Sequence, residues 1–122
     1  MRVLYVDDDR VQALLFAAAC RLASGVDVET AGSGAEALEL AGDFDPQLLV
    51  IDLHLPDTTG YALLPRLRAT LRRPAPAILC SADDARHVGA SARDAGFDAC
   101  WTKPVDPPAL VAELVRRRGE LA

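Results

Sequence analysis

Polar and charged side chains follow four short apolar runs of the sequence, at the point where each run ends. They are Asp7, Asp8, Asp9, Asp52, Ser81 and Lys103. Carboxylates held close together repel one another, and a hard divalent cation with oxygen ligands, above all Mg2+, relieves that repulsion. A hydroxyl and an amine suit the oxygens of a phosphoryl group. The set therefore predicts phosphoryl transfer to or near a carboxylate, with a metal ion and a lysine neutralising the transferred group.

Each of these residues also has an ordinary structural interpretation. A run of aspartates before a helix often caps that helix, and an aspartate before a turn is common. A serine at a strand end is usually bound by backbone, and most lysines are solvated. The joint placement at four strand ends favours a site over these separate explanations. Lys103 is also the only lysine of the chain.

The elements that position these side chains alternate along the chain. Short apolar runs, each followed by a stretch with helical period, predict strands and helices in turn. Strands are expected at 2–6, 26–31, 47–52, 77–81 and 99–102, and helices at 8–23, 33–41, 58–71, 83–95 and 106–118. This alternation predicts an α/β fold, a doubly wound five-stranded parallel sheet of the flavodoxin type with strand order 2-1-3-4-5. In such a sheet ligands bind beyond the carboxyl ends of the strands.

Local signals indicate where several helices begin and end. Ser33 and Glu36 have the spacing of a capping box, and Gly42 is expected to stop the helix that they open. Pro65 lies inside the third helix, where it removes a backbone hydrogen bond, so we expect a late start or a kink there. The first helix is predicted from apolar residues at helical spacing, namely Val11, Leu14, Leu15, Ala18, Ala19 and Leu22.

Length and composition exclude several classes of protein. The 122 residues suffice for one domain, which we expect to span 1–122. A net charge of −5 argues against direct binding of nucleic acid, because phosphate contacts need a basic face. No apolar run approaches the roughly 20 residues of a membrane span, and a signal-peptide pattern is lacking. Three cysteines without a CxxC pair fit reduced thiols, so we expect a cytoplasmic location.

Four segments together resemble the receiver domain of two-component response regulators. They are "LYVDDD", "LLVIDLHLPDTTG", "AILCSA" and "WTKP", in that order, so the resemblance covers the whole chain. It implies a phosphoacceptor signalling domain that receives a phosphoryl group from a sensor histidine kinase or a phosphotransfer domain. Such a domain catalyses only its own phosphorylation and dephosphorylation, so the resemblance does not imply an enzyme with a separate substrate.

The resemblance also assigns roles to single residues. Asp52 matches the phospho-acceptor, which attacks the phosphoryl group of a phosphohistidine. Asp7 and Asp8 match the acidic pair of a Mg2+ (or Mn2+) site, with Asp8 the favoured direct ligand. Asp52 and the backbone carbonyl of His54 would complete the protein ligands of that ion.

Other matching positions concern the phosphoryl oxygens and the lifetime of the phosphorylated state. The resemblance implies that the Ser81 hydroxyl, the Lys103 amine and the backbone of Ala82 bind the phosphoryl group. His54 and Asp83 fall where the family varies its side chains to tune dephosphorylation. Further matches are Pro56 and Gly60 after the acceptor, and Pro104 after the lysine, where a cis bond is frequent.

One position departs from the family pattern. Three residues before the lysine, receivers usually carry a Tyr or Phe that swings inward on phosphorylation, and here Cys100 stands there with Trp101 after it. Neighbouring strand residues point to opposite faces, so Trp101 is not expected to substitute. How a change at the switch residues Ser81 and Cys100 on phosphorylation would be transmitted to the output face is therefore open. The expected output face, also the candidate homodimer interface, consists of 83–95, 99–102 and 106–118.

Three other functional interpretations are weighed against this one. Cys100 keeps open a pseudo-receiver that acts only as an interaction module, without phosphorylation. A phosphatase of the haloacid-dehalogenase type would need an aspartate where His54 stands, and a larger cap region. A flavodoxin would need a hydroxyl- and glycine-rich phosphate loop where the three aspartates 7–9 would repel the cofactor.

The context of the domain is also open at this stage. The segment "GFDACWTKPVDPPALVAEL" is similar to receivers attached to hybrid sensor histidine kinases, so both a free-standing receiver and a part of a longer protein fit. Partner choice is expected to be set by the first helix, through Arg10, Gln12 and Ala13 near the acceptor.

Overall fold

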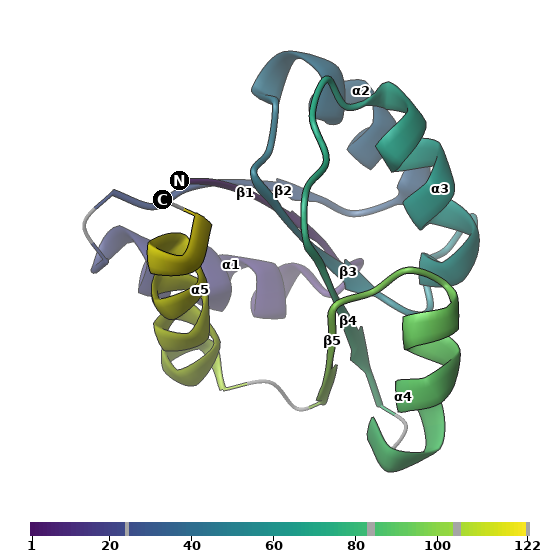
Figure 1. Ribbon diagram of the computed structural model, residues 1–122. Helices are drawn as coiled ribbons and strands as arrows, with labels where there is room; N and C mark the ends of the chain where they lie inside the picture. Colours follow the sequence, from purple (N-terminus) through teal and green to yellow (C-terminus); the bar gives the residue numbers. More distant parts are fainter. Residues whose placement is uncertain (24, 83–84, 104–105, 122) are drawn as a thin grey trace.

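Parallel strands form one sheet in the order β2-β1-β3-β4-β5 in this computed structural model (Figure 1). The strands are β1 (Arg2–Val6), β2 (Asp27–Ala31), β3 (Leu48–Asp52), β4 (Ala77–Ser81) and β5 (Ala99–Thr102). The helices are α1 (Arg10–Arg21), α2 (Gly34–Phe44), α3 (Gly60–Thr70), α4 (Ala85–Asp94) and α5 (Pro107–Leu121). The structure describes residues 1–23, 25–82, 85–103 and 106–121, with only the backbone at 85–87 and 117–121. The predicted fold class and strand order are confirmed.

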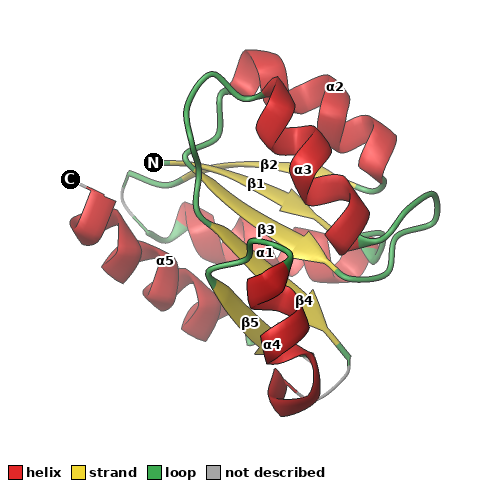
Figure 2. Ribbon diagram, turned by 45° about the vertical axis from the view of Figure 1, so that its right-hand side comes forward, coloured by secondary structure: helices red, strands yellow, loops and turns green. Residues whose placement is uncertain are grey.

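Helices cover both faces of the sheet, which is why the strands are apolar throughout. Figure 2 shows α1 and α5 on one face and α2, α3 and α4 on the other. Side chains alternate between the two resulting cores along β1: Tyr5 packs with Phe16 of α1, whereas Leu4 packs in the core that contains Leu64 of α3. This double burial holds the carboxyl ends of neighbouring strands in fixed positions.

The first helix buries a different face from the one that its apolar spacing suggests. Its buried residues are Ala13, Phe16 and Cys20. The exposed fractions of the large apolar residues on its outer face are 67% for Val11, 68% for Leu14, 51% for Leu15 and 91% for Leu22. The large apolar residues whose spacing predicts the helix therefore form a stripe that faces away from the core.

The second helix confirms its predicted start but not its predicted end. Ser33 is the N-cap, and its hydroxyl accepts from the Glu36 N–H at 3.1 Å, while the Glu36 carboxylate accepts from the Gly32 N–H at 3.3 Å. The prediction that Gly42 stops the helix is wrong, because the helix continues to Phe44 and ends at Asp45 in the left-handed conformation (φ 51°). A glycine inside a helix costs only about 1 kcal/mol, which the burial of neighbouring apolar residues offsets.

The third helix accommodates its proline inside a continuous helix. Thr59 is the N-cap, and its hydroxyl accepts from the Ala62 N–H at 3.2 Å, so the helix begins at Gly60. Pro65 lies in the interior of α3, so the first of the two alternatives, a late start, is wrong, and the kink stays a prediction. The exposed side of the helix carries Pro65.

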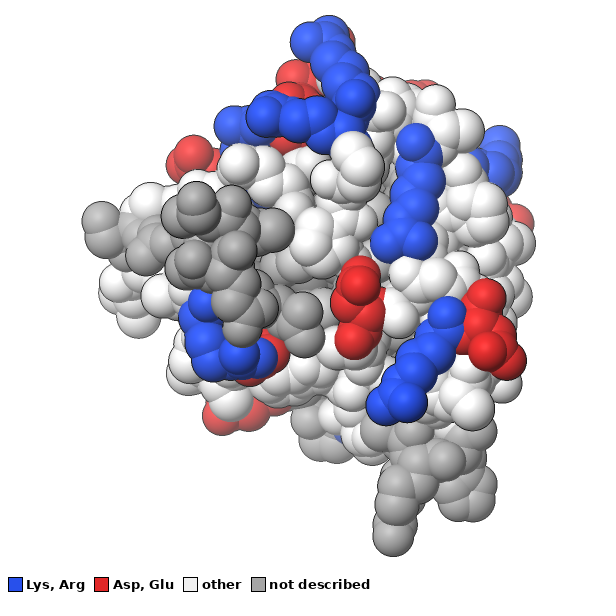
Figure 3. Space-filling model, in the orientation of Figure 1, with Lys and Arg blue, Asp and Glu red and all other residues white. Residues whose placement is uncertain are grey.

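The described surface carries charges of both signs, and the three cysteines are unpaired. On the face in Figure 3, basic and acidic side chains are interspersed. None of the helices described here combines the length and the apolar character that crossing a bilayer requires. Cys20, Cys80 and Cys100 are free thiols, and burial raises the pKa of Cys20 to about 11.

Candidate functional site

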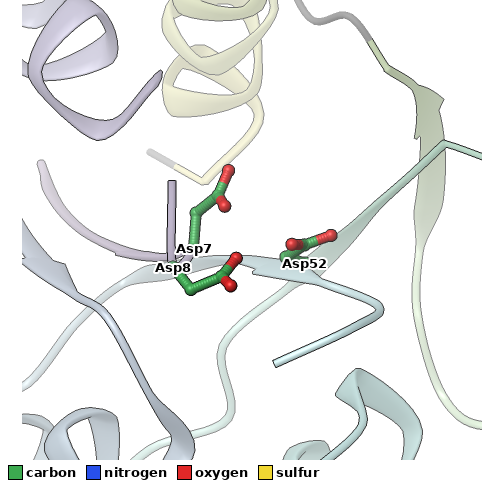
Figure 4. Close-up of side chains that lie close together, drawn as sticks. All are labelled: Asp7, Asp8 and Asp52. Atoms are coloured by element: carbon green, nitrogen blue, oxygen red, sulfur yellow. The ribbon is translucent and has the colours of Figure 1, made fainter. Parts of the chain in front are cut away.

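Three aspartates converge beyond the carboxyl ends of β1 and β3 (Figure 4). Val6 of β1 pairs with Ile51 of β3, so the residues that follow them, Asp7 and Asp52, stand side by side. One carboxylate oxygen each of Asp7, Asp8 and Asp52 lies within 4.8 Å of the others. Asp7 and Asp52 are buried and Asp8 is exposed, so the cluster opens to solvent on the side of Asp8.

Lys103 joins the two buried members of this cluster. Its Nζ lies 3.1 Å from Asp7 Oδ2 and 3.1 Å from Asp52 Oδ2. The position of the Lys103 backbone is fixed, because its N–H donates to the Ser81 carbonyl at 2.7 Å. This bond continues the pairing of β4 and β5. The only lysine of the chain thus reaches across the ends of the sheet to both carboxylates.

Burial and charge shift the pKa values of these groups. Burial raises the pKa of Asp52, the Lys103 ammonium opposes that rise, and the Asp7 and Asp8 carboxylates add to it. Burial alone would lower the pKa of Lys103, but the hydrogen bonds and charges of Asp7 and Asp52 outweigh it, so its pKa is raised. The lysine therefore stays charged at neutral pH.

The cluster has the composition of a divalent cation site. Three carboxylates face one ammonium, which leaves an excess of negative charge around a group of oxygen atoms. Mg2+ prefers one or two carboxylates together with water, and the exposed side at Asp8 provides room for water ligands. The residues present fit such an ion.

One side chain that supports the acidic pair was not among the predicted site residues, namely Tyr5. The Tyr5 hydroxyl donates to Asp7 Oδ2 at 3.2 Å, and its ring stacks on Phe16 with centroids 4.3 Å apart. Burial and the nearby Asp7 raise the pKa of Tyr5, so it remains a donor. The only signal for it was a tyrosine inside an otherwise aliphatic strand. The third aspartate of the run, Asp9, has the ordinary role considered for it: it caps α1.

Of the other predicted site residues, the structure describes Ser81, Ala82 and His54, which end or follow β3 and β4. Ser81 is fully buried at the end of β4, followed by the exposed Ala82. His54 is exposed and forms an isolated bridge with Thr59 in the loop after β3. Asp83 and Pro104 lie outside the residues that the structure describes.

Cys100 and Trp101 point to opposite faces of the sheet, as the alternation of a strand predicts. Cys100 packs against the core under α3 and α4, and Trp101 packs against the core under α1 and α5. Trp101 is therefore not in the position of the aromatic residue that Cys100 replaces.

The expected partner surface on α1 is only partly accessible. Ala13 is 8% exposed and packs in the core, so it offers a partner little surface beyond the edge that it contributes to a hollow beside Asp7. Arg10 is exposed and, with Leu14, Gly32 and Glu36, lines the same hollow, which has a volume of about 360 Å3.

Comparison with known proteins decides the family. A family model described as the response regulator receiver domain matches residues 3–115 of the chain. The chain belongs to this family. The receiver domain of a Francisella response regulator superimposes with a TM-score of 0.87 and 28% identity, over 99% of this chain and 98% of that one.

Curated relatives place the receiver domain in longer proteins. The transcriptional regulatory protein PrrA of Mycobacterium tuberculosis is 36% identical over 99% of this chain and 52% of its own length. The autoinducer 2 sensor kinase/phosphatase LuxQ of Vibrio harveyi is 30% identical over 90% of this chain and 13% of its own length. The chain spans about half of PrrA. As a receiver domain it is a phosphoacceptor of two-component signalling, and the phosphorylation-independent alternative is not favoured.

Proposed function

We propose that Asp52 is the phosphoacceptor of this receiver domain, and that residues 1–122 act as a single domain. A carboxylate oxygen of Asp52 attacks the phosphorus of a phosphohistidine; the new O–P bond forms as the P–N bond breaks, and the electron pair returns to the imidazole. The observation that carries this proposal is the convergence of Asp52, Asp7, Asp8 and Lys103.

The same cluster supports a Mg2+ (or Mn2+) requirement. Asp7, Asp8 and Asp52 would hold the ion through carboxylate oxygens, together with the backbone carbonyl of His54. When bound, the ion supplies positive charge that neutralises the transferred phosphoryl group.

Three groups would bind the remaining phosphoryl oxygens. Lys103 is charged and already lies at Asp52, the Ser81 hydroxyl is at the end of the adjacent strand, and Ala82 offers a backbone N–H. Attack of water on the phosphoryl group would later restore Asp52 and release inorganic phosphate. His54 and Asp83 would tune the rate of that hydrolysis.

The stripe of exposed apolar residues on α1 supports a helical protein partner. The stripe of Val11, Leu14 and Leu15 begins two residues after Asp9, so a helix lying along it would end near the aspartates. A sensor histidine kinase or a phosphotransfer domain would present its phosphohistidine on such a helix. The conformational response to phosphorylation would pass from Ser81 and Cys100 to the face formed by α4, β5 and α5. This face is the candidate homodimer interface.

Intact-mass measurement after incubation with acetyl phosphate tests the proposal. We expect a gain of about 80 Da that requires Mg2+ and is lost in Asp52→Asn. Asp27→Asn makes the same change of charge at the opposite end of the sheet, and it should retain the gain. An absent adduct with every divalent metal tried would instead favour a domain that only binds partners.

A further inference from the structure

The loop between β3 and α3 is a small hairpin whose base is fixed by the sheet. The Leu53 N–H donates to the Cys80 carbonyl at 2.8 Å, and the Gly60 N–H donates to the Leu53 carbonyl at 2.8 Å. His54 and Thr59 face each other in the next rung. The arm of the hairpin that continues β3 therefore carries Asp52, Leu53 and the His54 backbone in succession, and the opposite arm carries Thr59 and Gly60.

The tip of the hairpin is attached to a distant helix. The turn closes with the Leu55 N–H donating to the Thr58 carbonyl at 3.1 Å. Asp57, inside this turn, accepts from the Gly34 N–H at 2.9 Å through Oδ1 and from the Ala35 N–H at 3.0 Å through Oδ2. These two bonds lower the pKa of Asp57, so it is ionised at neutral pH.

The contact is close as well as polar. A Cβ atom at Gly34 would lie 2.6 Å from Thr58 Cγ2, so only glycine lets the hairpin tip approach the first turn of α2 this closely. Asp57 and Ser33 together satisfy the N–H groups of Gly34, Ala35 and Glu36, which have no acceptor within the helix.

The attachment links the hairpin to the other half of the acidic cluster. The segment before α2 follows β2, and the Ala31 carbonyl at the end of β2 accepts from the Asp7 N–H at 2.9 Å. Asp7 is thus bound to the end of β2, the segment after β2 leads into α2, and the first turn of α2 binds Asp57. Together with the hairpin that follows Asp52, these contacts form a closed ring.

We propose that Asp57 is a positioning residue of the divalent cation site. By holding the hairpin tip on α2, it fixes the His54 carbonyl relative to Asp8 and Asp52, so that the ion meets its ligands without reordering the loop. This inference rests on the cation site proposed above. Groups that orient metal ligands without touching the metal commonly contribute about 10-fold or more to affinity.

Two variants separate positioning from helix capping. Asp57→Ala removes two bonds to the first turn of α2 and frees the hairpin tip. Ser33→Ala also removes a cap bond of α2, but that bond goes to the Glu36 N–H of the same helix and not to the hairpin. Each should lower the urea midpoint of the metal-free protein by a similar amount, because each removes an N-cap acceptor of α2.

Calorimetric titration of these proteins with MgCl2 is the decisive measurement. We expect Kd to rise about 10-fold in Asp57→Ala and to stay within about twofold of wild type in Ser33→Ala. Asp57→Asn keeps one acceptor oxygen and should fall between them. At saturating Mg2+, Asp57→Ala should reach the wild-type yield of phosphorylated protein.

The possible results separate the positioning role of Asp57 from the existence of the cation site. If wild type binds Mg2+ and Asp57→Ala binds it equally well, or Ser33→Ala loses as much affinity, the positioning role is wrong and the cation site stands. If wild type does not bind Mg2+ at all, the cation site is wrong and the positioning role is wrong with it.

Discussion

At the scale of single residues, the arrangement of the acidic cluster lowers the stability of the domain. Asp7 and Asp52 are both buried, and one ammonium, that of Lys103, is shared between them. Burial, only partly opposed by Lys103, raises the pKa of Asp52, which means that folding disfavours its charged form. The proposed acceptor must react as a charged nucleophile, yet its surroundings disfavour that charge.

Asp52→Asn should therefore stabilise the metal-free domain at pH 7 by about 1 kcal/mol. A carboxyl whose pKa is raised by folding contributes stability below its unfolded pKa, near 3.9, and loses it as pH rises through the folded value. The gain from Asp52→Asn should accordingly be large at pH 7 and small at pH 4, as measured by urea unfolding in EDTA.

Asp8→Asn is the matched control for this measurement. Asp8 belongs to the same cluster but is exposed, so its replacement should change stability less. A variant Asp52→Asn that is less stable than wild type at pH 7 would show that the pair with Lys103 outweighs burial.

The sequence was sufficient for the residues whose position depends on strand ends. Asp7, Asp52, Ser81 and Lys103 could be placed together because parallel strands bring their carboxyl ends to one edge. Asp57 could not be predicted in the same way, since its partners on α2 are more than 20 positions away and the contact depends on tertiary packing.

At the scale of elements, helix ends and faces were the less predictable features. The spacing along α1 predicted a helix but not which side is buried, because its outer stripe is as apolar as its inner face. Gly42 did not end α2, since Phe44 still packs against the core and Asp45 can adopt the left-handed conformation that ends the helix. In both cases packing overrode a local signal.

Asp45 also makes the end of α2 sensitive to pH. Its carboxylate lies 2.8 Å from Arg73 and 3.3 Å from Arg2, and the hydrogen bond from Arg73 is the main reason that its pKa is lowered. A lowered pKa contributes stability above the unfolded pKa, which is lost as pH falls through the folded value. Asp45→Asn, which still tolerates the left-handed conformation, should lower the urea midpoint at pH 7 and match wild type in strong acid.

Asp43→Asn provides the comparison for Asp45. It changes the same charge on an exposed position of the same helix, and its midpoint should follow that of wild type across the pH range. A pH-independent loss in Asp45→Asn would assign the effect to the helix cap rather than to the arginines.

Replacement of Pro65 is expected to increase the stability of the domain, whereas replacement of Asp45 is expected to decrease it. It occupies an exposed interior position of α3, where proline withholds a backbone N–H from the Tyr61 carbonyl. Pro65→Ala should raise the free energy of unfolding by about 1–2 kcal/mol, after allowance for the greater freedom of the unfolded chain. Urea unfolding measures it, with Arg66→Ala as the neighbouring control, and an unchanged or lower stability would contradict the assignment.

At the scale of the whole molecule, the cluster joins elements from the two halves of the fold. Asp7 and Asp8 follow β1, Asp52 ends β3 and Lys103 follows β5, so the site exists only when the sheet is assembled. An ion that binds these residues together therefore binds the folded chain and not the unfolded one. Binding of that kind adds stability that grows with the logarithm of ion concentration.

Thermal unfolding should report this coupling directly. At an excess of Mg2+ about 100-fold over its Kd, folding gains about 2.7 kcal/mol, which corresponds to a rise in Tm of about 10 °C. Potassium chloride at equal ionic strength separates this gain from general screening of charge. Asp8→Asn, which removes one of the carboxylates, should lose most of the rise, whereas Asp27→Asn at the opposite end of the sheet should keep it. A rise that is equal in all three proteins would place the ion elsewhere on this acidic surface, because only a site built from the ends of β1 and β3 can depend on Asp8 and not on Asp27.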